Sequence, residues 1–153
     1  MIPAPNYKTV FESLPACHVL LSPGFVILAA TASYCKATHT TPQQILNRNL
    51  FDIFPENAHT VEHPEGKNLA YSLKQVLRTK TAHALALQRY NLQVPSAKDS
   101  TTVERWWRLT NTPVLNLQQE IIYIISTVED VTYMMDTLEE VENNFKAVPK
   151  TKM

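Results

Sequence analysis

Glycine, cysteine and long apolar runs are scarce in this chain of 153 residues, and each shortage excludes a class of protein. The two glycines, Gly24 and Gly66, lie far apart, whereas a phosphate-binding loop needs two or three within about eight residues. The two cysteines, Cys17 and Cys35, are too few for a disulfide scaffold and lack metal-ligand spacing. No apolar run approaches the roughly 20 residues of a membrane-spanning helix, and the N-terminus has no secretory signal pattern. We therefore expect a cytoplasmic protein with reduced thiols and no membrane span.

An excess of charge of either sign is also missing. Basic and acidic residues both number 14, so the formal net charge is zero, which argues against a dedicated nucleic-acid binder. The charges are unevenly distributed, however. Residues 67–108, called the basic segment below, hold eight basic and two acidic residues, whereas residues 109–153 hold three basic and seven acidic ones. Such asymmetry bears on partners and assembly rather than on the fold.

The hydrophobic pattern predicts a mixed fold in which short helices separate an early hairpin from a late group of strands. Prolines, N-cap residues and helical spacing of apolar residues predict helices at 6–14, 31–38, 41–46, 49–54, 67–79 and 132–147. Alternation and turn residues predict strands at 18–22, 25–30, 83–94, 103–115 and 121–131. Two early and three late strands favour one five-stranded antiparallel sheet with helices on one face, an α+β fold.

Five short motifs, in this order and at these distances, resemble those of the PAS sensor family. They are the entry motif Phe11–Pro15, the first hairpin around Pro23-Gly24, the stretch Ile45–Pro55, the NTPV at 111–114 and the EDVT at 129–132. The stretch Ile45–Pro55 is similar to the family pattern IxGRxLFDxFP, with Asn47 where glycine is usual. The turn at 116–120 also lacks the usual glycine, and Asn116 is the residue there that tolerates a left-handed conformation. The resemblance extends from about Tyr7 to Thr132, and the segments 88–90 and 104–107 look most like those of bacterial two-component sensors.

The resemblance implies a PAS-like five-stranded antiparallel sheet with short helices on one face and a C-terminal signalling helix. Residues 1–15 would form an N-terminal tail and short flanking helix, residues 16–131 the PAS core, and residues 132–153 the output helix and tail.

The implied function is that of a sensory PAS domain of a bacterial signal-transduction protein linked to a histidine kinase. Such a domain binds a small ligand or a partner and relays its state through the C-terminal helix; it is not an enzyme. One alternative is a pure interaction or dimerisation module without ligand. Another is a small-molecule enzyme or carrier, but no nucleophile–base or acid pair occurs at a recognisable spacing. The kinase part is absent from the sequence, which is either a stand-alone protein or an excised fragment.

The cofactor is unknown, and the residues argue against haem, flavin and a metal. A haem-binding PAS domain usually holds haem by a histidine of its long helix, but residues 67–79 contain none, and His63 and His83 lie outside. Flavin photosensors of the family carry a cysteine in the short helix at 49–54, and none is present. Residues 59–63 match the zinc-protease pattern H-x-x-E-H, but flanking prolines leave at most two helical turns.

The best ligand-binding candidates are polar and aromatic residues of the late strands: Arg89, Tyr90, Trp107, Asn111 and Tyr123. Alternation predicts that Arg89 shares a face with His83, and that Trp107 shares one with Asn111. Arginine with amphipathic aromatic residues could hold a small carboxylate or an aromatic metabolite. The same residues could equally pack the sheet or pair with acids. Which face meets the helices is not determined by the sequence.

Signal output is predicted at Asp130 and Thr132, where the last strand becomes a helix. Either residue could cap that helix. A helix cap without any role in signalling would explain the presence of both residues equally well. In the helix, Val131, Met134, Leu138, Val141 and Phe145 recur at 3-4-3-4 spacing, the pattern of a short coiled coil. We therefore expect a homodimer through the N-terminal and C-terminal helices, with a downstream kinase or effector domain as a further partner. The acidic C-terminal helix is expected to lie against the basic segment of the same chain or of a partner.

Overall fold

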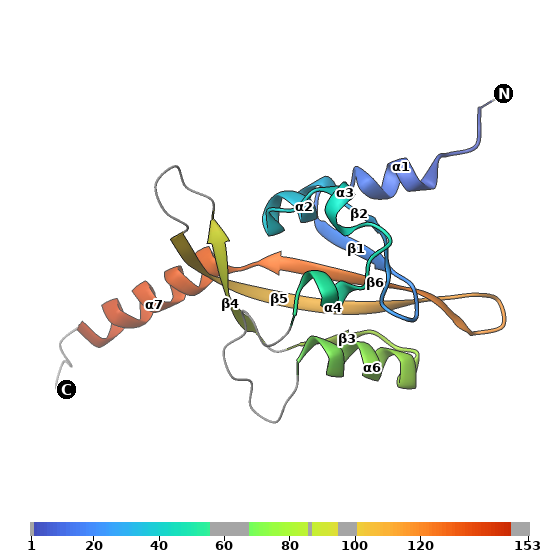
Figure 1. Ribbon diagram of the computed structural model, residues 1–153. Coiled ribbons are helices and arrows are strands. Elements are labelled where there is room, and N and C mark those ends of the chain that lie inside the picture. The colour runs from blue at the N-terminus through green and yellow to red at the C-terminus, as the bar shows by residue number, and fades with distance from the viewer. Residues whose placement is uncertain (1, 56–67, 86, 95–100, 148–153) are drawn as a thin grey trace.

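The computed structural model describes residues 2–55, 68–85, 87–94 and 101–147, with side chains for all of these except 88–94, 101–104 and 147. The sheet is antiparallel, and its strands are β1 (Cys17–Leu21), β2 (Ile27–Ala30), β3 (His83–Ala84), β4 (Gln88–Val94), β5 (Thr101–Leu115) and β6 (Ile121–Asp130). Their order across the sheet is β2-β1-β6-β5-β3, and β4 also pairs with β5 (Figure 1). The N-terminal hairpin therefore sits beside the last strand, and the early and late strands form one antiparallel sheet, as predicted.

The helices of the described residues are short, apart from two. They are α1 (Tyr7–Glu12), α2 (Ala32–Thr38), α3 (Pro42–Ile45), α4 (Leu50–Ile53), α6 (Leu69–Thr79) and α7 (Thr132–Ala147). The last of these, α7, begins at the end of β6, packs against β5 and extends away from the sheet (Figure 1). No helix among the described residues is long and apolar enough to cross a bilayer.

The main hydrophobic core lies between one face of the sheet and four helices. Buried side chains from the sheet, such as Val19, Leu21 and Ile124, pack against Tyr34 of α2 and Leu73 of α6, and α3 and α4 add further buried residues. Each fully buried Leu, Ile or Val contributes about 1.5–3 kcal/mol. The packing settles which face of the sheet meets the helices: Trp107, Leu109 and Asn111 are buried on the same face of β5. We call this the inner face.

Capping residues explain why the short helices begin where they do. The side chains of Asn6, Thr31, Asn49 and Asn68 each accept a hydrogen bond from a backbone N–H in the first turn of the helix that follows. Asn47 has a φ of 64°, so it adopts the left-handed conformation for which the family's glycine is suited.

Two local features differ from the sequence-based expectations. At the turn before β6, the residue with positive φ is Gln119 (φ 63°) rather than Asn116. The Asn116 side chain instead accepts hydrogen bonds from the backbone N–H groups of Gln118 and Glu120, both at 2.9 Å, which closes the turn without glycine.

The predicted strand at 83–94 is divided into β3 and β4. His83 pairs with Asn111 in β5, whereas Gln88 pairs with Trp107, so β3 and β4 differ in register by one residue. Alternation therefore does not run unbroken from His83 to Arg89, and the prediction that these two residues share a face is wrong. An irregularity of this kind is a β-bulge, which changes which residues point to each face.

Candidate functional site

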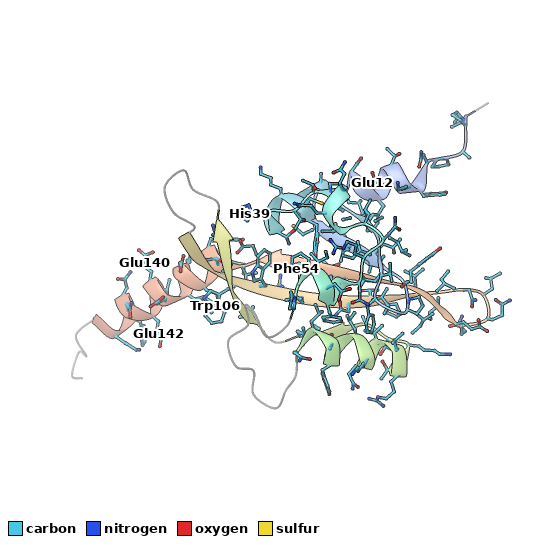
Figure 2. All side chains as sticks on the ribbon, viewed as in Figure 1. Glu12, His39, Phe54, Trp106, Glu140 and Glu142 are labelled. Carbon is cyan, nitrogen blue, oxygen red and sulfur yellow. The ribbon has the colours of Figure 1, made fainter. Side chains whose placement is uncertain are left out.

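A small cavity lies between the inner face of the sheet and the helices. Its volume is about 80 Å³, and its apolar walls come from Leu50, Phe54, Leu69, Leu109 and Val128. Figure 2 shows Phe54, which directly follows α4, over the middle of the sheet. Apolar walls with a few polar groups are the usual character of a small-molecule site.

Four further lining residues carry polar groups: Tyr34, Thr38, Trp107 and Ser126. The Thr38 hydroxyl donates to the Tyr34 carbonyl at 2.8 Å and is therefore already engaged. Trp107 is 4 % exposed, and its indole Nε1 has no hydrogen-bond partner among the described residues. The Ser126 hydroxyl also lines the cavity, and none of the side-chain hydrogen bonds found among the described residues involves it. Leaving a buried donor without a partner costs about 1–3 kcal/mol, so the Trp107 Nε1 favours a site that binds a ligand.

Next to the cavity, a buried polar chain joins the sheet to α6. The Asn111 Nδ2 donates to the Ser72 Oγ at 2.8 Å, and the Ser72 Oγ shares a hydrogen bond of 2.7 Å with the His83 Nδ1. Ser72 and Asn111 are both fully buried. The Asn111 Oδ1 has no partner among the described residues, and the register places Asn111 directly opposite Ser126. This chain holds α6 against the sheet beside the cavity.

The structure brings some of the sequence-predicted ligand residues together and leaves others apart. Trp107 lines the cavity, and Asn111 lies beside it on the inner face. Tyr123 precedes the buried Ile124, is 39 % exposed and does not line the cavity. Arg89 pairs with Trp106 and Tyr90 with Arg105, while their side chains lie outside the described part of the chain.

The predicted output residues form a compact junction between β5, β6 and α7. The Asp130 Oδ1 accepts hydrogen bonds from the Thr132 backbone N–H at 2.9 Å and from the Thr132 Oγ1 at 2.5 Å. The Thr132 Oγ1 in turn accepts from the Trp106 backbone N–H at 2.9 Å, and the Val131 N–H donates to the Trp106 carbonyl at 2.9 Å. The start of α7 is therefore fastened to the main chain of β5, and Figure 2 shows Trp106 near this end of the helix.

Two titratable residues of β1 lie close to this region of the sheet. Burial raises the pKa of the Cys17 thiol, and the negative charge of Asp130 raises it further, so Cys17 stays a thiol at neutral pH. Burial lowers the pKa of His18, whose Nδ1 lies 2.9 Å from the Thr127 Oγ1 and whose ring contacts Phe11 of α1. Both cysteines are free.

Metal binding finds no support in the part of the chain that the structure describes. No cluster of three or more His, Cys, Asp or Glu side chains occurs there. The H-x-x-E-H segment at 59–63 lies outside the described residues.

Comparison with known proteins identifies the fold family. The family model for the PAS fold matches residues 11–133. The chain belongs to the PAS family. Members of the PAS family are generally sensory, non-enzymatic modules. A comparison with curated protein sequences finds no significant match.

Solved structures with the same fold include PAS domains of signalling proteins. A sensory box sensor histidine kinase from Vibrio cholerae is 13% identical, with a TM-score of 0.53, over 82% of this chain and 89% of that one. A PAS domain from a two-component sensor histidine kinase is 16% identical, with a TM-score of 0.53, over 81% and 92%. The Drosophila melanogaster Cycle PAS-B domain with bound ethylene glycol is 18% identical, with a TM-score of 0.50, over 74% and 98%. At these identities the likeness concerns the fold.

The sequence does not identify three polar residues of the cavity. It predicts a helix that contains Tyr34 and Thr38 and a strand that contains Ser126, without a binding role for any of them. A signal for Ser126 is nevertheless present, because it is a polar residue between the apolar Ile124 and Val128 on the same face of the strand.

Proposed function

We propose that this PAS domain is a sensor that binds a small molecule in the cavity and transmits its occupancy to α7. The observation that carries this proposal is the adjacency of two residues in β5. The side chain of Trp107 lines the cavity, and the main chain of the preceding Trp106 holds the start of α7 through Thr132 and Val131. A ligand that displaces the Trp107 ring would therefore act within one residue of the output junction.

The exposed apolar residues of α7 are the basis for proposing how the domain dimerises and passes on its signal. Met134, Leu138, Val141 and Phe145 are 37 %, 61 %, 59 % and 81 % exposed. They lie on one stripe of the helix, and pairing two such stripes in a coiled coil would bury them. We infer that α7 joins two copies of the chain and continues the signal into a histidine-kinase or other effector domain, in keeping with the kinase neighbours. The cytoplasmic location expected from the sequence stays a prediction.

The acidic side chains of α7 affect which surface the helix can pack against. Glu140 and Glu142 lie on the part of the helix that extends away from the sheet (Figure 2), and an ion pair joins Glu142 to Lys146 within the helix. Docking of this acidic helix on the basic segment, of the same chain or of a partner, stays a prediction.

The test of ligand binding is mass spectrometry of the purified protein under native and denaturing conditions, together with an absorbance spectrum. A colourless small molecule that is present under native conditions and lost on denaturation supports the proposal. An absorbing species would indicate haem or flavin instead. A protein that carries no bound mass and is dimeric would favour the alternative of an interaction module, for which the exposed α7 stripe is the supporting observation.

A further inference from the structure

Among the described lining residues, the cavity offers a ligand two uncharged polar groups, the Ser126 hydroxyl and the Trp107 indole N–H. Ser126 lines the cavity and is 2 % exposed to solvent. None of the side-chain hydrogen bonds found among the described residues involves its Oγ, whereas the Thr38 hydroxyl donates to the Tyr34 carbonyl. A hydroxyl can both donate and accept, so Ser126 suits an alcohol, carbonyl or amide group on a ligand.

Two buried atoms on the same face of the sheet as Ser126 lack a hydrogen-bond partner among the described residues. Asn111 pairs with Ser126 across β5 and β6, and its Oδ1 has no partner among the described residues. The Trp107 Nε1 in the cavity wall also lacks one there. One atom is an acceptor and the other a donor, and both are neutral. Buried polar groups are normally hydrogen-bonded, so this end of the cavity is suited to a neutral polar group rather than to hydrocarbon alone.

Charge is missing from the described lining of the cavity. None of the described lining residues is ionisable to a full charge near neutral pH. Arg105 and Arg108 flank Trp107 in β5, but neither lines the cavity, and Arg108 forms an ion pair with Glu129. Moving a carboxylate or ammonium group into such surroundings without a partner of opposite charge is costly. A small carboxylate, one of the ligands that the sequence allows, is therefore disfavoured.

The size of the cavity restricts the ligand further. Its volume of about 80 Å³ is roughly half that of an engineered apolar cavity of about 150 Å³ that binds benzene. In proportion, about three non-hydrogen atoms of a ligand fit inside it. The cavity is partly open, so the remainder of a larger ligand would extend out of it.

We propose that the cavity selects small neutral molecules that carry one hydroxyl, carbonyl or amide group, with Ser126 as the hydrogen-bonding anchor. This inference rests on the proposed function, because it assumes that the cavity is the ligand site. It adds the chemical class of the ligand and the residue that sets the specificity.

The test uses three probes of four carbons each with different head groups: butan-1-ol, butyrate and n-butylammonium. Each is titrated into the full chain while ¹H–¹⁵N spectra follow the indole N–H of Trp107, with Trp106→Phe used to assign the two tryptophans. Ser126→Ala removes the anchor, Ser126→Thr retains a hydroxyl, and Ser13→Ala is the matched control in an exposed position.

The expected result is that butan-1-ol shifts the Trp107 signal in a saturable manner at lower concentration than either charged probe. Ser126→Ala should weaken butan-1-ol binding roughly fivefold, the value of one neutral hydrogen bond. Ser126→Thr should restore much of that binding, and Ser13→Ala should leave it unchanged. Thermal melting of each variant, compared with the parent chain, shows that the fold is intact.

Other outcomes overturn the inference in distinguishable ways. Equal or tighter binding of butyrate or n-butylammonium would refute the neutral class while leaving ligand sensing in place. Butan-1-ol binding that Ser126→Ala does not weaken would refute the anchor. If no probe binds, the inference fails, and the mass spectrometry of the purified protein decides whether the proposed function fails with it.

Discussion

Replacing Thr132 by valine tests the junction that fastens α7 to the sheet. The substitution keeps the shape of the side chain and removes only its hydroxyl. Two hydrogen bonds are lost: the one accepted from the Trp106 N–H at 2.9 Å and the one donated to the Asp130 Oδ1 at 2.5 Å. The hydrogen bond from the Thr132 backbone N–H to Asp130 is independent of the hydroxyl and should persist.

The magnitude follows from the burial of these groups. The Trp106 N–H lies in a half-buried position, and a donor deprived of its acceptor costs about 1–3 kcal/mol when buried. The bond to Asp130 is exposed and adds little because water replaces it. We expect Thr132→Val to lower the free energy of unfolding by about 1–2 kcal/mol, or the melting temperature by roughly 3–6 °C.

The matched control is Thr137→Val in the same helix. The Thr137 hydroxyl donates to the Tyr133 carbonyl in an exposed position, so its loss should change the free energy of unfolding by less than about 0.5 kcal/mol. Urea denaturation measures both variants, and hydrogen exchange of the Trp106 amide should accelerate in Thr132→Val alone. Equal effects of the two substitutions, or unchanged exchange at Trp106, would refute the role of Thr132.

Three further predictions concern the core, the α1 contact and assembly. Ser72→Ala should destabilise the fold by about 1–3 kcal/mol in urea denaturation, because it removes the hydrogen-bond partner of two other polar side chains. An effect no larger than that of Ser33→Ala would show that these buried hydrogen bonds do not stabilise the fold. The lowered pKa of His18 means that the unfolded chain binds a proton more readily, so stability should fall as pH drops below about 6.5. His18→Gln should flatten this pH dependence in urea denaturation at pH 7, 6 and 5, and an unchanged slope would remove His18 as its source. Leu138→Ser should weaken dimerisation in sedimentation equilibrium, whereas Asn143→Ser, off the apolar stripe, should not; equal association constants would exclude the stripe as the interface.

The fold could be predicted from the sequence because its local signals agree with one another. Thr41-Pro42 begins α3 at Pro42, as predicted from N-cap and proline preferences, and the Pro23-Gly24 turn separates β1 from β2. Asn47 occupies the position with positive φ where the family has glycine. The division between β3 and β4 could not be predicted, because residues 83–94 alternate smoothly in sequence and the shift in register arises only from pairing with β5.

The candidate site was less predictable because a cavity depends on packing between distant segments. Alternation placed Trp107 and Asn111 on one face, and the structure agrees. It could not show which face meets the helices, so Tyr123 could not be separated from Trp107. Ser126 carries no motif, and its proposed role follows only from its place in the cavity wall opposite Asn111.

The central claim is that occupancy of the cavity reaches α7 through the junction at Thr132. The most direct test is one ¹H–¹⁵N titration with butan-1-ol that follows the Trp107 indole and the backbone amides of Trp106, Thr132 and Met134 together. We predict that all four signals shift with the same half-saturation, and that Thr132→Val keeps the Trp107 response while reducing that of Met134. A Trp107 signal that saturates while the amides of Thr132 and Met134 stay unchanged would contradict the claim.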